Sequence, residues 1–353
     1  MESQGARRPW VTWGLSLLGA AAFLWLASTR LRLWPDTLTL ESPWLLVAAA
    51  AMHVPYAIVR ALRLQYVFDP LVARSGGNRI SRRLLYGSGF VSFFVLLALP
   101  LKLGELSRPI LLARGRQPGL GLAEAIGGVA LERLVDGLVI VGMLFGGLAL
   151  SDVRLESKVA DIETIGAGMS AAFIVGVVVL VIAARMPQRA VAVAEAISGV
   201  FGERARTLVG SVVERVAGTM RGVLDLEHAV PFIGWSLLYW AITAAQLWLV
   251  LEACGIHLGA AAAAAIVAIV GLSIQLPGGP AQTGTFQVGA GWSLGLYLDD
   301  AALQSAGSTF ALLMYILQFV GAGVVALPGL ALLARVPTEE PAPDPGQIAS
   351  DAP

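Results

Sequence analysis

The sequence predicts an all-α protein, a polytopic helical membrane bundle of about eight spans with one or two re-entrant or broken helical elements. Hydrophobic residues make up 57% of the chain and charged residues only 14%, whereas an ordinary soluble domain has roughly 25% charged residues. The apolar residues also gather into long runs. Only helices and closed barrels satisfy their backbone hydrogen bonds in lipid, and long runs without polar alternation indicate helices.

Eight apolar runs are long enough to cross a bilayer. They cover residues 11–29, 43–59, 84–101, 122–150, 167–184, 230–251, 259–276 and 308–334, and a shorter, glycine-rich run at 285–298 is a ninth candidate. Arg7 and Arg8 precede the first run as in a signal sequence, but this run can span and further spans follow, so we expect an uncleaved first helix. The sequence therefore divides into a cytoplasmic N-terminus (1–10), a transmembrane domain (11–335) and a disordered tail (336–353) rich in proline and acid.

The charges of the loops predict which end of the bundle faces the cytoplasm. Residues 60–83 include six arginines and one acid, which places this loop on the cytoplasmic side. The segment 185–228 is also rich in arginine, and its apolar residues at helical spacing predict one or two amphipathic helices on the inner membrane surface. Residues 151–166 carry more acid than base and should lie outside.

A simple alternation of spans fails after the third run. If residues 84–101 crossed fully, the basic segment 102–116 would lie outside, against its charge. We therefore predict that residues 84–118 form a re-entrant hairpin that returns to the cytoplasmic side. Pro100 and Gly104 favour this hairpin, because proline and glycine interrupt helices and free backbone groups that only protein or water can satisfy at that depth.

A second broken element follows the seventh run, at residues 276–291. It is rich in glycine and proline and includes Pro277, Gly278, Gly279 and Gln287. Interrupted segments in both halves of a transporter are a pointer to a binding site between the halves. An ordinary turn is the alternative, and the two halves show no residue-level repeat.

Six ionisable residues interrupt the apolar sequence in two patches, Lys102, Glu105 and Arg108 in the first and Glu132, Arg133 and Asp136 in the second. A charge at the centre of a bilayer costs on the order of 2.5 to 3.5 kcal/mol, so each group needs a partner or water. Spacings of three and four residues place the members of each patch along one helix face, and the formal charges of the two patches cancel. We therefore expect the patches to face each other, Glu132 and Asp136 holding Arg108 or Lys102, and Glu105 holding Arg133.

Two interpretations of these charges stay open. A purely structural ion-pair network is one of them. The other is a hydrated site, which we favour because desolvation offsets the Coulomb gain of buried ion pairs and leaves them a poor source of stability. We expect His53, Gln246, Gln275, Gln304 and Gln318 to make hydrogen bonds between helices.

The sequence gives no sign of catalysis, cofactor or metal. Its His, Cys and carboxylate residues have no metal-ligand spacing, and it contains neither a phosphate-binding loop nor a serine elbow. The formal net charge is zero and no basic helix with interleaved aromatics occurs, so we expect no nucleic-acid partner. We expect a protein that is not an enzyme.

The two charged patches resemble those of the lysylphosphatidylglycerol synthase transmembrane family, also called flippase-like or UPF0104 integral membrane proteins. The patterns are Pro100-Leu-Lys102-Leu-Gly104-Glu105-Leu-Ser-Arg108 and Leu131-Glu132-Arg133-Leu-Val-Asp136. Arg60 and Arg63 after the second run, and Leu-Pro-Gly-Gly-Pro at 276–280, are similar to further features of the family. The resemblance covers residues 11–335.

The resemblance implies a multi-pass protein of the cytoplasmic membrane that translocates or presents a polar-headed lipid. The substrate would be an aminoacyl-phospholipid, a glycolipid or a polyprenyl-phosphate sugar. Lys102 and Arg108, with Arg60 and Arg63 at the inner rim, would attract its phosphate, while the carboxylates would hold the cations or contact an amino headgroup. The expected substrate-binding residues are Arg60, Arg63, Lys102, Glu105, Arg108, Glu132, Arg133 and Asp136, and the expected lining residues are Pro100, Gly104, Pro277, Gly278, Gly279 and Gln287.

Two departures limit what the resemblance implies. Well-known members carry a soluble C-terminal aminoacyltransferase domain, whereas this sequence ends in a polar tail, so we do not expect synthase activity. Relatives often have a glutamate where Gln287 stands, so this protein either lacks the role of that acid or uses Asp299 or Asp300 for it.

Two other functions are alternatives to lipid movement. The first is a membrane-embedded transferase for a lipid-linked sugar, with Glu132 and Asp136 as acid and base. The second is a non-transporting scaffold for a cell-envelope enzyme. Besides the lipid, we expect a lipid-modifying or glycosyltransferase enzyme as a partner.

Overall fold

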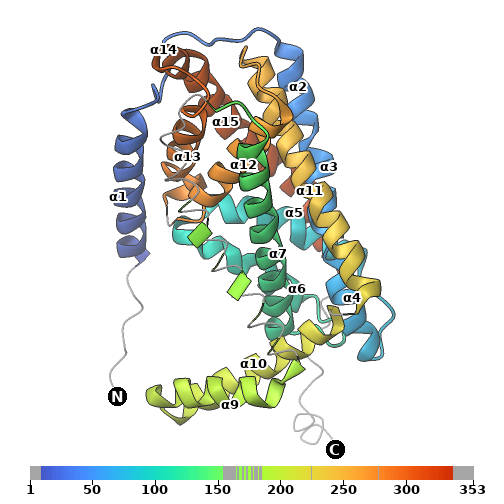
Figure 1. Cartoon of the computed structure of the whole chain (residues 1–353). Coiled ribbons are helices and arrows are strands. Elements are labelled where there is room, and N and C mark those ends of the chain that lie inside the picture. The colour runs from blue at the N-terminus through green and yellow to red at the C-terminus, as the bar shows by residue number, and fades with distance from the viewer. Residues whose placement is uncertain are drawn as a thin grey trace, which may run out of the picture.

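The computed structural model describes residues 9–153, 185–223, 225–276 and 278–336, with scattered positions between 164 and 182. All regular elements in these ranges are helical, as the sequence predicts. Long helices stand side by side as a bundle, and two helices lie across its lower end (Figure 1). Most of the predicted span 167–184, Pro277, residues 1–8 and the tail 337–353 lie outside the described residues.

The helices of the N-terminal half are α1 (Pro9–Ser28), α2 (Pro43–Ala51), α3 (His53–Leu62), α4 (Gln65–Arg74), α5 (Arg82–Ala98), η1 (Pro100–Leu106), α6 (Ser107–Arg114) and α7 (Leu122–Ala149). Those of the C-terminal half are α9 (Pro187–Ser198), η2 (Gly199–Phe201), α10 (Glu203–Val223), α11 (Leu226–Ala253), α12 (Ala260–Ser273), η3 (Pro280–Gln282), α13 (Thr285–Leu294), α14 (Asp300–Ala302), η4 (Leu303–Gly307) and α15 (Ser308–Leu333).

Within the described ranges, three helical runs are long and apolar enough to cross a membrane: Pro43–Arg74, Leu226–Ala253 and Asp300–Leu333. Helix α7 is as long as α11, but its sequence includes three charged residues near its centre. The number of about eight spans therefore stays a prediction.

The second helical run is longer than the sequence predicts. The apolar run ends at Val59, but helix continues to Arg74, with short breaks at Met52 and at Arg63 and Leu64. Arg60 and Arg63 consequently lie inside the bundle, where they are 5% and 1% exposed. The expectation that they stand at the inner rim is wrong, because carboxylates of α7 neutralise Arg63 in the interior.

Residues 82–117 form the predicted hairpin. The backbone N–H of Ser81, just before α5, donates to Gln117 Oε1 just after α6 at 3.3 Å, so both ends of the segment lie at the same end of the bundle. The turn is η1, where Lys102 has a left-handed φ of +59°. Gly104 lies against the backbone of Val95 and Leu96, and a side chain at this position would collide with it.

Helices α12 and α13 form a second hairpin. Helix α13 packs along α12, with Gly289 next to Ser273 and Val270. Ala281 and Gln282 in the turn also have left-handed φ angles, +57° and +60°. The turns η1 and η3 contact each other. Helix α13 returns to the end that carries α14, opposite the end of α6 and α4, so the two hairpins enter the bundle from opposite ends (Figure 1).

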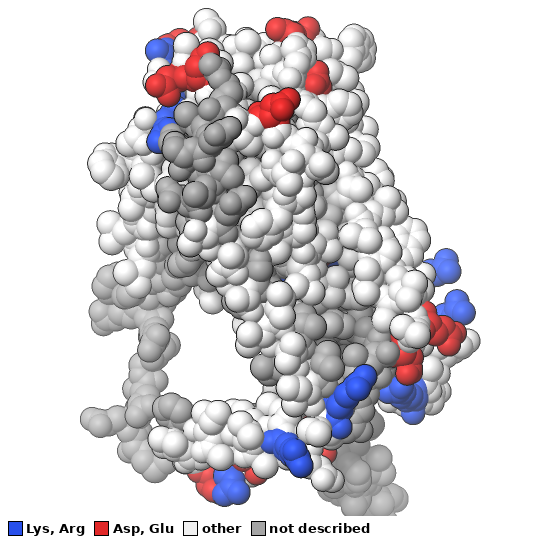
Figure 2. Space-filling view, in the orientation of Figure 1, with Lys and Arg blue, Asp and Glu red and all other residues white. Residues whose placement is uncertain are grey.

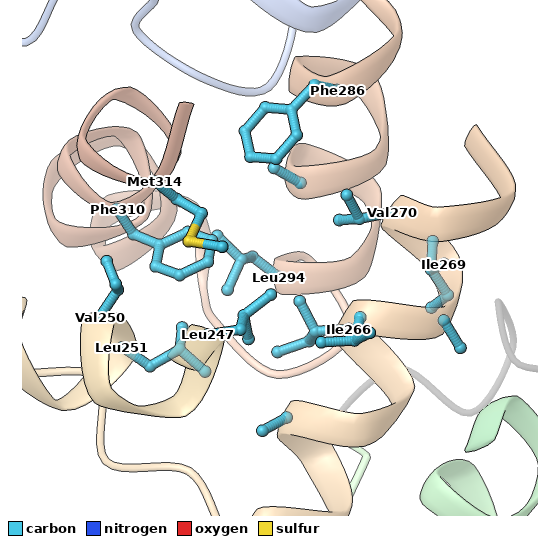
Figure 3. Packing of buried hydrophobic residues seen from close by; sticks show 14 of the residues in the cluster. Leu247, Val250, Leu251, Ile266, Ile269, Val270, Phe286, Leu294, Phe310 and Met314 are labelled. Carbon is cyan, nitrogen blue, oxygen red and sulfur yellow. The ribbon is translucent and has the colours of Figure 1, made fainter. Parts of the chain in front are cut away.

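Two apolar clusters fill the bundle. In the larger one, α11, α12, α13 and α15 pack through side chains such as Leu247, Ile266, Phe286 and Phe310 (Figure 3). The smaller cluster joins α4, the start of α5 and α6, and includes Phe68. Tyr56 on α3 belongs to the larger cluster and Leu64, two turns later, to the smaller. The stretch of α3 between them therefore crosses a boundary between two apolar regions.

The two ends of the bundle differ in exposed charge. Acidic side chains predominate at the end that carries α14, and most of the visible basic ones lie at the other end (Figure 2). The exposed acids include Asp36, Glu41, Asp299 and Asp300, and the exposed bases include Arg74, Arg79, Arg83 and Arg114. Helices α9 and α10, which confirm the predicted helices within 185–228, lie across this basic end (Figure 1). The basic end is the one for which the sequence predicts a cytoplasmic location.

Candidate functional site

A buried ion-pair network lies at the boundary between the two apolar clusters. At its centre the Arg63 guanidinium binds Asp136 with two nitrogens, Nη1 to Oδ1 at 2.5 Å and Nη2 to Oδ2 at 2.8 Å. Arg63 Nη2 also donates to Glu132 Oε1 at 2.5 Å, and the guanidinium stacks over the Tyr239 ring at 4.5 Å. One arginine from the end of α3 thus joins α3 to α7 and α11.

Glu132 has a second arginine partner. Arg108 on α6 donates from Nη1 to both Glu132 oxygens, at 3.1 and 2.9 Å, and from Nη2 to the carbonyl of Arg60 at 3.3 Å. Arg63, Arg108 and Glu132 are each at most 2% exposed. Such pairs contribute little net stability, because removing two charges from water offsets their attraction. They do fix the first hairpin against α7.

The predicted pairing of the two patches is confirmed in one contact and wrong in another. Glu132 holds Arg108, as expected. Glu105 lies 3.6 Å from Lys102 of its own patch and makes no ion pair with Arg133. Sequence reasoning also missed the main partner of Asp136, because Arg63 stands at the end of an apolar run and reads as a membrane-surface residue.

Arg60 and Arg133 have no carboxylate partner among the described residues. Arg60 donates to the carbonyl of Gly89 at 3.0 Å, and its guanidinium lies 5.1 Å from the centre of the Phe93 ring. Arg133 makes no hydrogen bond or ion pair in the described part of the chain, and its buried Nε has no acceptor. With both arginines of α3 included, the site has five cationic and three carboxylate side chains, so two positive charges remain unbalanced.

A cavity of about 100 Å³ lies beside the network, between the two hairpin turns. Arg60, Lys102 and Arg133 contribute cations to its wall, and Glu105 and Asp136 contribute carboxylates. Tyr56, Phe93, Tyr239, Trp240, Gln275, Gln282 and Gln318 supply most of the rest of its polar and aromatic lining. The sequence does not predict that these aromatic and amide residues line a cavity, because apolar helices do not reveal from sequence which face does so; for Gln275 and Gln318 it predicts only hydrogen bonds between helices.

The two hairpin turns touch at the cavity. Lys102 Nζ in η1 donates to Gln275 Oε1, just after α12, at 2.9 Å. Gly278 and Gly279 line the cavity as predicted, and Gly104 lines a smaller one of about 10 Å³ next to it, together with Arg60 and Arg133. Both broken elements that the sequence singles out therefore contribute to the wall of the cavity.

One other predicted lining residue, Gln287, has a different position. Gln287 does not line the cavity: its Oε1 accepts a hydrogen bond from the Gly284 N–H at 2.7 Å and caps the start of α13. Pro100 is the first residue of η1. Pro277 lies outside the described residues.

His53 and Gln246 form the expected contact between helices. Gln246 Nε2 on α11 lies 2.6 Å from His53 Nδ1 on α3 and also donates to the carbonyl of Ala49 at 2.8 Å. In the described ranges, no group of three His, Cys, Asp or Glu residues could hold a metal ion.

Comparison with known proteins identifies the family. Residues 12–333 match the model of the lysylphosphatidylglycerol synthase TM region. No curated protein matches the chain significantly, and no solved structure does. Because the match covers nearly the whole chain, including both hairpins and all eight charged residues of the site, the chain belongs to the lysylphosphatidylglycerol synthase TM family, a family of membrane proteins tied to lipid handling.

Proposed function

We propose that this protein translocates a polar-headed lipid between the leaflets of the cytoplasmic membrane, or presents it to a lipid-modifying or glycosyltransferase enzyme. The observation that carries the proposal is the cavity between two hairpins that enter from opposite ends. A headgroup at this position has a charged and hydrogen-bonding wall in the middle of an otherwise apolar bundle. Both hairpin turns contribute residues to the wall of the cavity.

The unpaired arginines support a lipid ligand over a purely structural network. Arg63 and Arg108 already have carboxylate partners, so the ion pairs of the network form without Arg60 and Arg133, although the Nε atoms of Arg63 and Arg108, like that of Arg133, have no acceptor among the described residues. Arg60 is buried and Arg133 is half-buried with a buried Nε, and cationic groups withdrawn from water beside a cavity are costly unless an anion neutralises them. A lipid phosphate is the anion that a membrane supplies, and guanidinium binds phosphate with two parallel hydrogen bonds.

The hydrogen bonds of Glu132 and Asp136 argue against the transferase alternative. A general acid or base must be free to exchange a proton with a substrate. Glu132 accepts hydrogen bonds from two arginines, and Asp136 from Arg63 and Trp240. Neither carboxylate is free for acid or base work.

A leaflet-exchange assay tests the proposal. The purified protein is reconstituted into liposomes with a fluorescent lipid, and dithionite measures the fraction of probe that reaches the outer leaflet. We expect faster exchange than in empty vesicles, and slower exchange with Arg133→Gln. The control is Arg83→Gln, which removes an exposed arginine at the start of α5. Exchange no faster than in empty vesicles for every lipid would contradict translocation and favour presentation to a partner.

A further inference from the structure

We propose that the ligand of this cavity is an anionic lipid whose phosphate carries a compact, uncharged, hydroxyl-rich headgroup, such as a single sugar or a polyol, and not an aminoacylated, cationic headgroup. This inference rests on the proposed function and selects among its three substrate classes. Arg60 and Arg133 bind the phosphate, and side-chain amides that line the same cavity bind the hydroxyls.

The charge of the wall favours an anion. Arg60 and Arg133 line both the main cavity and the smaller one beside it, so their guanidinium groups share one space. Neither group has a carboxylate within ion-pair distance among the described residues. A ligand with one or two negative charges would balance the excess of two positive charges.

The same wall disfavours an amine. An ammonium group needs a carboxylate that is not already neutralised. The cavity offers Asp136, which Arg63 binds with two hydrogen bonds, and Glu105, which lies 3.6 Å from Lys102. A lysyl headgroup would have to compete with a resident cation for either carboxylate, next to two unpaired arginines that repel it.

The remaining wall suits hydroxyl groups. Gln282 and Gln318 line the cavity, and their side-chain amides make no hydrogen bond within the described ranges. An amide both donates and accepts, so it matches a hydroxyl, which does the same. The phenol oxygens of Tyr56 and Tyr239 lie 2.9 Å apart and use one proton between them, which leaves the other for a ligand. The small volume of about 100 Å³ fits one compact headgroup better than an oligosaccharide.

Lipid binding measured apart from transport tests the inference. Native mass spectrometry of the detergent-solubilised full chain is carried out with four lipids: phosphatidylglycerol, a polyprenyl-phosphate hexose, lysyl-phosphatidylglycerol, and a glucosyl diacylglycerol that has no phosphate. We expect the first two to bind. The last two should bind at least about tenfold more weakly, because lysyl-phosphatidylglycerol adds an ammonium group that the arginines repel and glucosyl diacylglycerol lacks the phosphate. Whichever of phosphatidylglycerol and the polyprenyl-phosphate hexose binds more tightly shows whether the ligand is a phospholipid or a polyprenyl-phosphate sugar.

Variants locate the binding. Arg60→Gln and Arg133→Gln should each weaken binding of the preferred lipid about tenfold, while Arg133→Lys should restore part of it by keeping the charge. Gln318→Leu should weaken the sugar or polyol lipids and leave binding of a lipid phosphate without a headgroup, phosphatidic acid, unchanged. Arg83→Gln should change neither the binding of the sugar or polyol lipids nor the binding of phosphatidic acid.

The outcomes separate the inference from the proposed function. If lysyl-phosphatidylglycerol binds best and is exchanged between leaflets, the headgroup assignment is overturned and translocation stands. If the phosphate lipids bind in an arginine-dependent way but none is exchanged, the assignment stands and translocation is overturned. If none of the four lipids binds, or binding ignores Arg60 and Arg133, the cavity is not the ligand site.

Discussion

Arg63 and Asp136 meet side by side through two hydrogen bonds, 73 residues apart in the sequence and both buried. Asp136 Oδ1 also accepts a hydrogen bond from Trp240 Nε1 at 2.9 Å, so one carboxylate connects α3, α7 and α11. An arginine holds such a position better than a lysine would, because its planar fork matches both carboxylate oxygens.

Replacing Arg63 with methionine should destabilise the protein strongly. The substitution keeps the bulk but leaves Asp136 as an unneutralised buried charge, and breaking one partner of a buried pair costs about 3 to 5 kcal/mol of the free energy of unfolding. Thermal unfolding in detergent measures the change. The double variant with Asp136→Leu should recover part of the loss, because both charges are then gone. If the double variant lost as much stability as the two single variants lose together, the direct pairing of Arg63 with Asp136 would be contradicted.

The matched control is an exposed pair. Arg74 and Asp225 lie 3.8 Å apart and are 54% and 67% exposed. Arg74→Gln should change stability by less than about 1 kcal/mol, because water screens exposed ion pairs.

Gly104 in the first hairpin turn should not tolerate alanine. A Cβ there would collide with the backbone of Val95 and Leu96, which cannot move aside as a flexible side chain could. Gly104→Ala should therefore lower the unfolding temperature and reduce lipid exchange together. Gly142→Ala is the comparison, since nothing lies within 4 Å of a Cβ at that position, and alanine in a helix is favoured over glycine by roughly 0.5 to 1 kcal/mol. Equal effects of the two substitutions would contradict the tight turn.

The stability contributed by His257 should depend on pH. This exposed residue follows α11, and its Nδ1 lies 2.7 Å from Glu252 Oε2, a hydrogen bond that, with the nearby charges of Glu252 and Glu41, raises the pKa of the imidazole. A raised pKa in the folded state means that the contribution is fully present below the unfolded-state pKa of about 6.5 and is lost as the pH rises through the folded-state value. His257→Gln should therefore lower the unfolding temperature at pH 6 and change it little at high pH. A difference between the variants that stays constant with pH would exclude this linkage.

Accessibility of introduced cysteines should distinguish the two ends of the bundle. The parent for this experiment is Cys254→Ala, which removes the buried natural thiol. Arg83→Cys and Arg114→Cys, at the two ends of the first hairpin, should both react with a membrane-impermeant maleimide from the cytoplasmic side. Asp36→Cys and Asp300→Cys should react from the opposite side. Labelling of the first two from different sides would mean that the hairpin crosses the membrane.

The helical class and the first hairpin follow from the sequence. Apolar run length predicts helices, and the basic residues on both sides of 84–118 predict that the chain returns, which the Ser81 to Gln117 hydrogen bond confirms. The position where the second helical run ends could not be predicted from the sequence. Val59 ends the apolar run, yet helix continues past Arg63, because the carboxylate partners that allow it come from a helix far away in the sequence.

The candidate site was only partly predictable for the same reason. Spacing along a helix places Glu132 and Asp136 on one face, but it does not tell which of several arginines reaches them. The charges of the two patches cancel in the sequence, and the positive excess appears only once α3 adds Arg60 and Arg63. The sequence marks Gln318 only as a residue that could hydrogen-bond between helices and Gln282 only as part of the second broken element, because which helix face lines the cavity is not visible in the sequence.

The separation of Arg63 from Asp136 along the chain also sets an order of events during synthesis. Ribosomes add about 5 to 20 residues per second, so the 73 residues between the partners take about 4 to 15 s to emerge. During that interval the newly made second helical run has arginines without their carboxylates, and their cost in hydrocarbon keeps this end of the run near the aqueous surface. We therefore expect the second helical run to reach its final depth only once α7 has supplied Glu132 and Asp136.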